Sequence, residues 1–355
     1  MRQEKITKEK VLMTGNEAMA RGAIEAGCSF YAGYPITPQN EIPAYMAIQM
    51  PASGGVFIQA ESEIAAINMV FGAAAAGTRA MTSSSSPGVS LMQEGISYIA
   101  GAALPAVILN VMRGGPGLGN IAPSQSDYFQ ATRSGGHGDY RCIVLAPGSV
   151  QEAYDIMPIA FDLADKYRNP VMVLSDGMLG QMMEPIQITK SPRHQPARYK
   201  KPWALTGCRN RKPNVVKSFY IAEGELERWN LELQKKYQAI EKNEQRLESM
   251  FSHEAETIIV SYGTMARIAK SLVMKLRSRG KKIGLIRPIT LWPFPKKGFN
   301  SLKRNQKILV VEMSYGQMLE DVRMAVGDKF KVGFLGRSGG GIPKETEIVR
   351  ALERL

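Results

Sequence analysis

Cysteine and histidine are both rare in this chain of 355 residues, which has three of each. Cys28, Cys142 and Cys208 are isolated from one another, and the sequence contains no CxxC pair. This scarcity argues against a disulfide framework, and against an iron–sulfur cluster or zinc site held by this chain alone. The histidines are equally scattered, so we expect no metal site within the chain.

Long apolar runs are also missing. No stretch approaches the roughly 20 uncharged apolar residues that a membrane-spanning helix needs. Residues 1–10 are charged and lack the apolar segment of a signal peptide. We therefore expect a cytoplasmic protein that neither spans nor binds a membrane.

Negative charge is in the minority, with 32 acidic against 45 basic residues and a formal net charge of +13. Such a surplus permits an acidic partner. The basic residues concentrate at 190–217 and in the C-terminal part, without an aromatic stacking pattern or a nucleic-acid-binding motif. We expect mostly a solvated surface and no nucleic-acid partner.

The order of apolar segments predicts an α/β fold in two parts. Residues 11–186 alternate between short buried-strand segments and stretches of helical length, which is typical of a parallel sheet with helices on both faces. A polar, basic segment follows, and its charged part at 223–250 predicts one long exposed helix. The alternation then resumes. The expected divisions are a first domain at 1–190, a linker at 191–255 and a smaller α/β domain at 256–355.

Two acidic residues stand at the start of the apolar stretch 64–77, which has small or apolar residues on every face and predicts a helix buried on all sides. Glu61 and Glu63 can interact there with the helix dipole, and Ser62 can cap the first turn. Two carboxylates at the entrance of a buried helix also suggest that one binds a ligand. Both interpretations of Glu63 stay open on this pattern alone.

Two further candidates follow predicted strands. Thr37 precedes Pro38, an arrangement that suits a helix cap, and its hydroxyl could equally meet a substrate anion. Arg113 ends the buried strand 106–112 and could grip a carboxylate or phosphate, or be an ordinary surface arginine. The glycine-rich run after it lacks the spacing of a dinucleotide-binding motif.

These segments occur in an order that closely resembles the alpha subunit of 2-oxoacid:ferredoxin oxidoreductases, nearest to the branched-chain 2-oxoisovalerate type and then to the 2-oxoglutarate type. The resemblance covers nearly the whole chain. It is carried by YPITP (34–38), AESE (60–63), TSSSSPG (82–88), LMQEGISY (91–98), NVMRGG (110–115), QSDYFQ (125–130), GHGD (136–139), RPITLWPFP (287–295) and EMSYGQM (312–318).

The resemblance implies a pyrimidine-type thiamine-diphosphate-binding domain followed by a transketolase C-terminal-like α/β domain. It implies that Glu63 bonds N1′ of the aminopyrimidine, favouring the tautomer that activates thiazolium C2. Thr37 and Arg113 then match contacts to the substrate carboxylate. Pro35, Ile36 and His137 are further candidates near the cofactor, with loop packing or a surface turn as the alternative.

The expected reaction is oxidative decarboxylation of a 2-oxoacid to acyl-CoA and CO2, with coenzyme A as co-substrate and ferredoxin as electron acceptor. The run Ser175-Asp176-Gly177 only partly matches the Gly-Asp-Gly motif that holds the diphosphate and Mg2+ in this family. The resemblance therefore implies a beta subunit that carries this site, together with iron–sulfur and gamma subunits. The alternatives are a 2-oxoglutarate-specific enzyme, a transketolase-like subunit that does not use ferredoxin, and an inactive scaffold.

Overall fold

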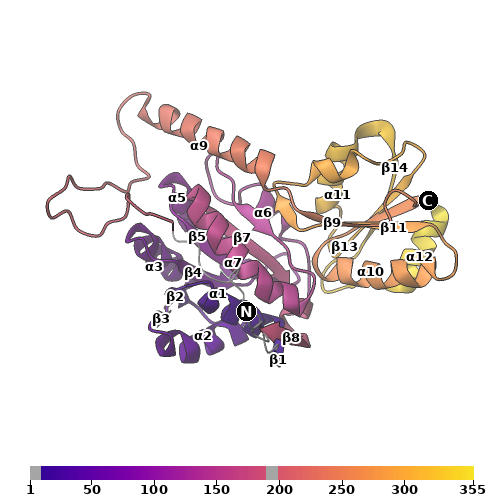
Figure 1. The fold of residues 1–355 in the computed structure, drawn as a ribbon, viewed down its shortest axis with the longest axis horizontal. Helices are drawn as coiled ribbons and strands as arrows, with labels where there is room; N and C mark the ends of the chain where they lie inside the picture. The colour runs from indigo at the N-terminus through magenta and orange to yellow at the C-terminus, as the bar shows by residue number, and fades with distance from the viewer. Residues whose placement is uncertain (1–8, 189–198) are drawn as a thin grey trace, which may run out of the picture.

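The computed structural model describes residues 9–188 and 199–355, and it has two lobes, each built around a sheet (Figure 1). Residues 1–8 and 189–198, which include the start of the predicted basic segment, lie outside the described part. The first lobe contains a seven-stranded sheet of order β12-β6-β7-β5-β4-β2-β3. Its strands are β2 (Phe30–Gly33), β3 (Val56–Gln59), β4 (Ala80–Ser84), β5 (Ala106–Met112), β6 (Ile143–Leu145), β7 (Pro170–Asp176) and β12 (Thr290–Trp292).

All pairs in this sheet are parallel except that of β12 with β6. Helices α1 and α7 pack together on one face, and α3 and α5 pack together on the other. Both α5 and α7 contact strand β7, yet in the described part neither helix of one pair packs on a helix of the other. The helices of this lobe are α1 (Gly15–Glu25), α2 (Glu41–Ala52), α3 (Glu63–Ala75), α4 (Ser86–Leu91), α5 (Gln93–Gly101), α6 (Tyr128–Thr132), α7 (Val150–Tyr167) and α8 (Gly177–Gln181). The predicted parallel sheet with helices on both faces is confirmed.

The second lobe has a five-stranded sheet of order β14-β13-β10-β11-β9, parallel except at the edge strand β9. Its strands are β9 (Leu247–Met250), β10 (Thr257–Val260), β11 (Ile283–Pro288), β13 (Lys307–Glu312) and β14 (Lys331–Gly336). Its helices are α10 (Gly263–Arg277), α11 (Gln317–Val326) and α12 (Glu345–Arg354), with 3-10 turns at Lys296–Phe299 and Gly327–Lys329. A separate two-stranded sheet in the first lobe pairs β1 (Glu9–Thr14) with β8 (Met183–Ile188).

Two sequence-based expectations about helices are wrong. The helix expected over 223–250 ends earlier, as α9 (Glu225–Asn243), because Glu244 accepts hydrogen bonds from Lys166 (2.7 Å) and Tyr167 (2.7 Å) and the following residues join the second sheet as β9. Helix α3 is also not buried on all sides, since Ile64 is 48% exposed and Asn68 is exposed too. Apolar composition alone does not tell which face of a helix is covered.

A segment that follows β5 fastens the two lobes together. The amide of Gln125 donates to the carbonyl of Met313 (2.9 Å), and the amide of Met313 donates to Gln125 Oε1 (2.9 Å). The Nε2 of Gln125 also donates to the carbonyl of Tyr262 (2.9 Å). Tyr128 donates to Asp321 (2.5 Å) across the same contact. The second lobe therefore holds the chain 12 residues after Arg113. None of the helices in the described ranges is long and apolar enough to cross a membrane.

Candidate active site

Three of the predicted site residues lie at the carboxyl edge of a run of adjacent strands. Thr37 follows β2, Glu63 follows β3 and Arg113 follows β5, while residues 84–86 close β4 between them. Ligands in open α/β sheets bind at this edge, where the strands end and the loops begin. Segments far apart in the sequence therefore meet in one place, as the sequence predicted.

Glu63 is the first residue of α3 and is only 4% exposed. Ser62 caps this helix by accepting a hydrogen bond from the amide of Ala65 (3.2 Å), so the predicted cap is confirmed. The Ser84 hydroxyl donates to Glu63 Oε1 over 3.3 Å, and it is the one hydrogen-bond partner of this carboxylate within the described ranges. Gly88 packs so closely that a Cβ there would lie 2.2 Å from the same oxygen. Glu61, by contrast, is exposed, so only Glu63 is held inside.

Arg113 is a buried cation whose side chain contacts no carboxylate among the described residues. It is 6% exposed, and its Nη1 and Nη2 donate to the carbonyls of Thr37 (3.0 Å) and Leu118 (3.0 Å). Its Nε is buried without a hydrogen-bond partner in the described structure. A buried charge is costly unless it is paired and hydrogen-bonded, so this guanidinium is suited to an incoming anion.

The Tyr34–Gln39 loop differs from the expectation of a helix capped by Thr37. Helix α2 begins only at Glu41, and the amide of Gln39 bonds to the carbonyl of Ile36 (3.1 Å) to close a turn instead. The Asn16 side chain donates to the carbonyl of Pro38 (2.9 Å), a long-range contact that keeps this segment out of the helix. The prediction of a cap was wrong. The side chain of Thr37 is exposed beside Arg113 and available to a ligand.

A buried polar network that sequence reasoning missed holds this loop. Gln39 is fully buried, and its Oε1 accepts from the hydroxyl of Ser83 (2.6 Å), which is bonded to Tyr31 (2.7 Å). The Gln39 amide group reaches back to the carbonyl of Tyr34 (3.4 Å). No local pattern reveals these contacts. The only signal was polar side chains in segments that otherwise predict buried strands.

A second network supports Arg113 from behind. Its amide donates to Ser86 Oγ (3.0 Å), and the Ser86 hydroxyl donates to Asp127 (2.6 Å). Asn110 also donates to Asp127 (3.0 Å). Burial raises the pKa of Asp127, although the bonds from Ser86 and Asn110 oppose that shift. These contacts fix the backbone from which the guanidinium projects.

The loop after Arg113 is braced by the second lobe. Asn120 donates from Nδ2 to the carbonyl of Gly339 (3.0 Å), and its Oδ1 accepts from the amide of Ala122 (3.0 Å). Leu118 and Ile121 on this loop are 79% and 64% exposed. The loop therefore presents apolar side chains from a backbone that both lobes fix.

The remaining candidates for cofactor binding are less closely associated with Glu63 and Arg113. Pro35 is exposed and Ile36 half-buried in the loop that carries Thr37. His137 is exposed and lies edge-on to Tyr98, with its carbonyl accepting from Ser97 (2.7 Å). The structure records no contact from this imidazole to Glu63, Thr37 or Arg113 in its described part.

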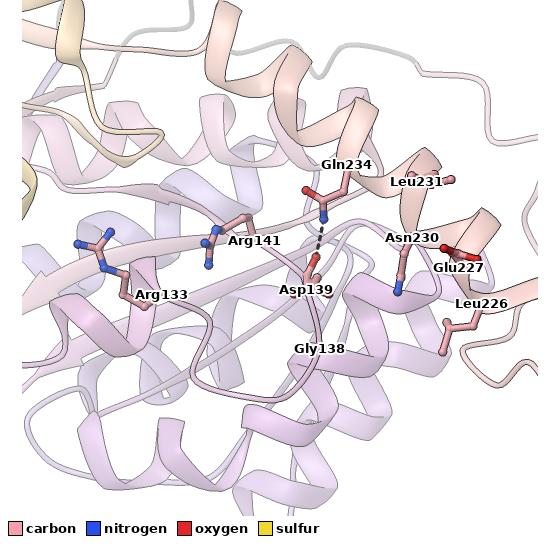
Figure 2. A pocket seen from close by; sticks show the side chains of 9 residues that line it. All are labelled: Arg133, Gly138, Asp139, Arg141, Leu226, Glu227, Asn230, Leu231 and Gln234. Atoms are coloured by element: carbon pink, nitrogen blue, oxygen red, sulfur yellow. Dashed lines mark hydrogen bonds between the residues drawn. The ribbon is translucent and has the colours of Figure 1, made fainter. Parts of the chain in front are cut away.

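A cavity of about 770 Å³ lies beside the His137 loop, between that loop and α9 (Figure 2). Gln234 of α9 donates across it to the carbonyl of Asp139 (2.9 Å). The side chains that line this cavity carry charges of both signs, with Arg133 and Arg141 opposed by Asp139 and Glu227. The lining includes none of the residues predicted for the site.

Asp176 belongs to the closest match to a diphosphate-binding motif, but its carboxylate forms hydrogen bonds within this chain. Its Oδ1 accepts from the amides of Met178 (3.0 Å) and Leu179 (3.2 Å) and caps α8. Burial raises the pKa of its carboxyl group. In the described ranges, no cluster of three or more histidine, cysteine or acidic residues could hold a metal ion.

The pyrimidine part of thiamine diphosphate fits the residues that are present. Glu63 is a buried carboxylate with only one protein hydrogen bond of 3.3 Å among the described residues. The neighbouring Ser85 hydroxyl is buried at the same sheet edge without a partner in that part of the chain. Buried polar atoms are normally hydrogen-bonded, so these atoms are suited to a polar ligand.

Comparison with known proteins decides the family. Residues 21–252 match the family described as "Pyruvate flavodoxin/ferredoxin oxidoreductase, thiamine diP-bdg", and residues 255–348 match "Pyruvate:ferredoxin oxidoreductase core domain II". The chain belongs to the 2-oxoacid:ferredoxin oxidoreductases. It is thus a subunit of an oxidoreductase, and its first lobe is the thiamine-diphosphate-binding domain of this family.

Two curated relatives of this oxidoreductase subunit come from Methanothermobacter marburgensis. The ketoisovalerate oxidoreductase subunit VorB is 50% identical over 346 residues, which are 97% of either chain. The 2-oxoglutarate synthase subunit KorA is 38% identical over 371 residues, covering 97% of this chain and 98% of the relative.

Two solved structures resemble this chain. A 2-oxoglutarate:ferredoxin oxidoreductase from Magnetococcus marinus, with 2-oxoglutarate, coenzyme A and succinyl-CoA bound, matches with a TM-score of 0.87 and 28% identity. The match covers 98% of this chain and 65% of that longer one. A split-gene transketolase, described as an inactive beta4 tetramer, has a TM-score of 0.60 at 12% identity, a likeness of fold alone.

Proposed function

We propose that this chain is the alpha subunit of a multi-subunit enzyme that oxidises 2-oxoisovalerate, a branched-chain 2-oxoacid, to acyl-CoA and CO2 and passes the electrons to ferredoxin. The observation that carries the proposal is the pair of buried, oppositely charged side chains at one sheet edge. Glu63 and Arg113 are 4% and 6% exposed, and no ion pair joins either to another described residue. Each is suited to a different end of a bound cofactor and substrate.

Glu63 has the position and chemistry to bond N1′ of the aminopyrimidine of thiamine diphosphate. A carboxylate at this atom accepts or returns the proton that N1′ exchanges, and its burial keeps water from competing for it. Thiamine diphosphate, when bound, supplies the carbon nucleophile that attacks the 2-oxo group and makes decarboxylation possible. Pro35, Ile36 and His137 are proposed as further contacts of this cofactor.

Arg113 is proposed to hold the carboxylate of the 2-oxoacid. Two of its five N–H groups are used by the carbonyls of Thr37 and Leu118, which leaves Nε and one hydrogen on each terminal nitrogen for the substrate. The hydroxyl of Thr37 is exposed beside it and can donate to the same carboxylate. This grip orients the 2-oxo carbon toward the cofactor side of the site.

The choice of a branched aliphatic substrate rests on two observations. The relative named for ketoisovalerate is 50% identical to this chain, whereas the relative named for 2-oxoglutarate is 38% identical. The loop that follows Arg113, residues 114–123, contains no charged side chain and exposes Leu118 and Ile121. A second carboxylate, as in 2-oxoglutarate, would find no cation on this loop.

The other parts of the enzyme are proposed to reside on partner subunits. Asp176 caps α8 and is not free to bind Mg2+, so a beta subunit is assigned the diphosphate and the metal. The three cysteines of this chain are isolated, so iron–sulfur and gamma subunits are assigned the clusters and the contact with ferredoxin. Coenzyme A is the proposed co-substrate, and the cytoplasm the proposed location.

The test is reduction of methyl viologen by this chain co-expressed with its partner subunits, under anaerobic conditions with thiamine diphosphate, Mg2+ and coenzyme A. The substrates are 2-oxoisovalerate, 2-oxoglutarate and pyruvate. We expect coenzyme A-dependent reduction with the highest kcat/KM for 2-oxoisovalerate. Highest kcat/KM for 2-oxoglutarate would contradict the substrate assignment. No reduction by a complex with intact clusters would contradict the reaction and favour a transketolase-like enzyme or a scaffold.

A further inference from the structure

Residues 199–222, here called the arm, project from the first lobe as irregular chain ahead of α9 (Figure 1). The arm is fastened at both ends. Near its start, the amide of Leu205 bonds to the carbonyl of Ala75 (2.9 Å), and Lys201 pairs with Asp165 (2.7 Å). Near its end, Tyr220 stacks on Trp229 of α9, and their ring centroids are 6.1 Å apart. The segment between these contacts is therefore held in place.

The last part of the arm, residues 215–221, exposes large apolar side chains. Val215, Phe219 and Ile221 are 76%, 74% and 82% exposed. The intervening Val216 and Tyr220 are half-buried. Lys217 and Ser218 are exposed as well, so the segment leaves three large apolar side chains to solvent, while Val216 and Tyr220 pack on the protein.

The backbone of the same segment is also unused. Within the described ranges, no N–H or carbonyl group of residues 215–221 takes part in a hydrogen bond. An irregular segment with a free backbone and exposed apolar side chains offers a partner the same groups as an unpaired edge strand. Such segments are recognised by addition of a strand from another chain, in which the backbone bonds supply affinity and alternate side chains supply specificity.

The charge of the arm indicates which chain that is. Residues 199–222 carry six basic and no acidic side chains: Lys200, Lys201, Arg209, Arg211, Lys212 and Lys217. Lys201 and Lys217 pair with Asp165 and Glu225, which leaves the positive charge of the arm mostly on residues 200–212. Contact with a second copy would bring two such positively charged arms close together, which is unfavourable. An acidic partner avoids this repulsion and gains attraction.

We propose that residues 215–221 pair with an extended acidic segment of a partner subunit, and that Phe219 and Ile221 insert into apolar pockets of that subunit. The proposal rests on the proposed function only in taking the chain to work within a multi-subunit complex. The arm is thus an assembly element, separate from the residues that hold cofactor and substrate.

The first test places the photo-crosslinking residue p-benzoylphenylalanine at position 219 in the co-expressed complex. We expect an adduct with an Asp- and Glu-rich segment of a different subunit, located by mass spectrometry. An adduct with a second copy of this chain, or no intermolecular adduct in an intact complex, would overturn the proposal.

The second test compares a Phe219→Ala/Ile221→Ala double variant and a Lys212→Glu variant with Ser218→Ala, which shortens a neighbouring polar side chain. Dissociation of the complex on dilution is followed by mass photometry. We expect the double variant to raise the dissociation constant about tenfold or more, since both large apolar side chains lose their buried contacts. Lys212→Glu should weaken assembly at low salt, and Ser218→Ala should match the wild type.

Equal dissociation constants for all three variants would refute the arm's role. Thermal unfolding of the isolated chain separates a folding defect from an assembly defect, and we expect it to be unchanged. Neither the crosslinked adduct nor the dissociation constant depends on catalytic turnover. A complex that assembles through the arm without oxidising 2-oxoacids would contradict the proposed function alone, and an active complex indifferent to the arm variants would contradict this inference alone.

Discussion

Replacement of Arg113 by methionine is expected to abolish most of the substrate affinity without unfolding the protein. The guanidinium is 6% exposed, contacts no carboxylate among the described residues and keeps a buried Nε without a partner. Its two hydrogen bonds go to the carbonyls of Thr37 and Leu118, both exposed residues whose carbonyls water can reach after the substitution. We therefore expect the free energy of unfolding to change by no more than about 1 kcal/mol.

The effect on catalysis follows from the hydrogen bonds that remain for the substrate. A hydrogen bond to a charged group contributes about 1.5 to 3 kcal/mol, so the loss of two costs about 3 to 6 kcal/mol. At about 1.4 kcal/mol for each factor of ten, kcat/KM should fall by about 10²- to 10⁴-fold in Arg113→Met. Arg113→Lys keeps the charge but loses the fork geometry, and its fall should be about 10- to 150-fold.

The assay is coenzyme A-dependent viologen reduction by the co-expressed complex over a range of 2-oxoisovalerate concentrations. Arg21→Met is the matched control, because Arg21 lies on α1 in a partly exposed pair with Glu25 (2.9 Å) and should leave kcat/KM within about twofold. Thermal unfolding of each variant is measured beside the kinetics. A kcat/KM of Arg113→Met within twofold of the wild type, in a folded protein, would refute the assigned role.

Three further predictions concern the surroundings of the site. Asn120→Ala removes the hydrogen bond to Gly339 and should raise KM about two- to tenfold with little change in kcat, whereas an unaltered KM would show that the second lobe does not position the loop. Thr37→Val should lower kcat/KM about 10-fold or more and Thr37→Ser should largely preserve it; equal losses in both would argue for a packing effect. Burial raises the pKa of Glu248, but the hydrogen bond from Lys270 and the charge of Arg287 lower it by more, so the pKa of this carboxyl lies below its usual 4.5. The stability from this carboxylate should therefore be present above pH 4.5 and be lost as the pH falls through its folded-state pKa, so thermal unfolding of Arg287→Met should depend less on pH in that range than the wild type; parallel curves would contradict this.

The sequence was informative wherever a local pattern determines the structure. The apolar run 106–112 coincides with β5, so Arg113 stands at the predicted strand end. Parallel strands place their carboxyl ends on one edge, which is why Glu63, Thr37 and Arg113 could be expected together before any contact was known.

The rest depends on contacts between distant residues. Ser83 bonds Gln39 across 44 positions, and Asn120 reaches Gly339 across 219, so neither contact leaves a local pattern. The same holds for Thr37, where local preference predicted a cap but the bond from Asn16 to Pro38 decides the conformation. The exposed side of α3 was missed because hydrophobic composition does not specify what covers a helix.

The most direct test of the central claim is proton exchange at C2 of thiamine diphosphate bound to the complex, measured by quenched-flow deuterium exchange and NMR. In Glu63→Gln, which keeps the size of the side chain, we expect intact assembly and unchanged thermal unfolding but exchange slowed by about 10²- to 10⁴-fold, with a parallel loss of turnover. Wild-type exchange rates in a folded Glu63→Gln complex would contradict the account, because Glu63 would then have no part in activating the cofactor.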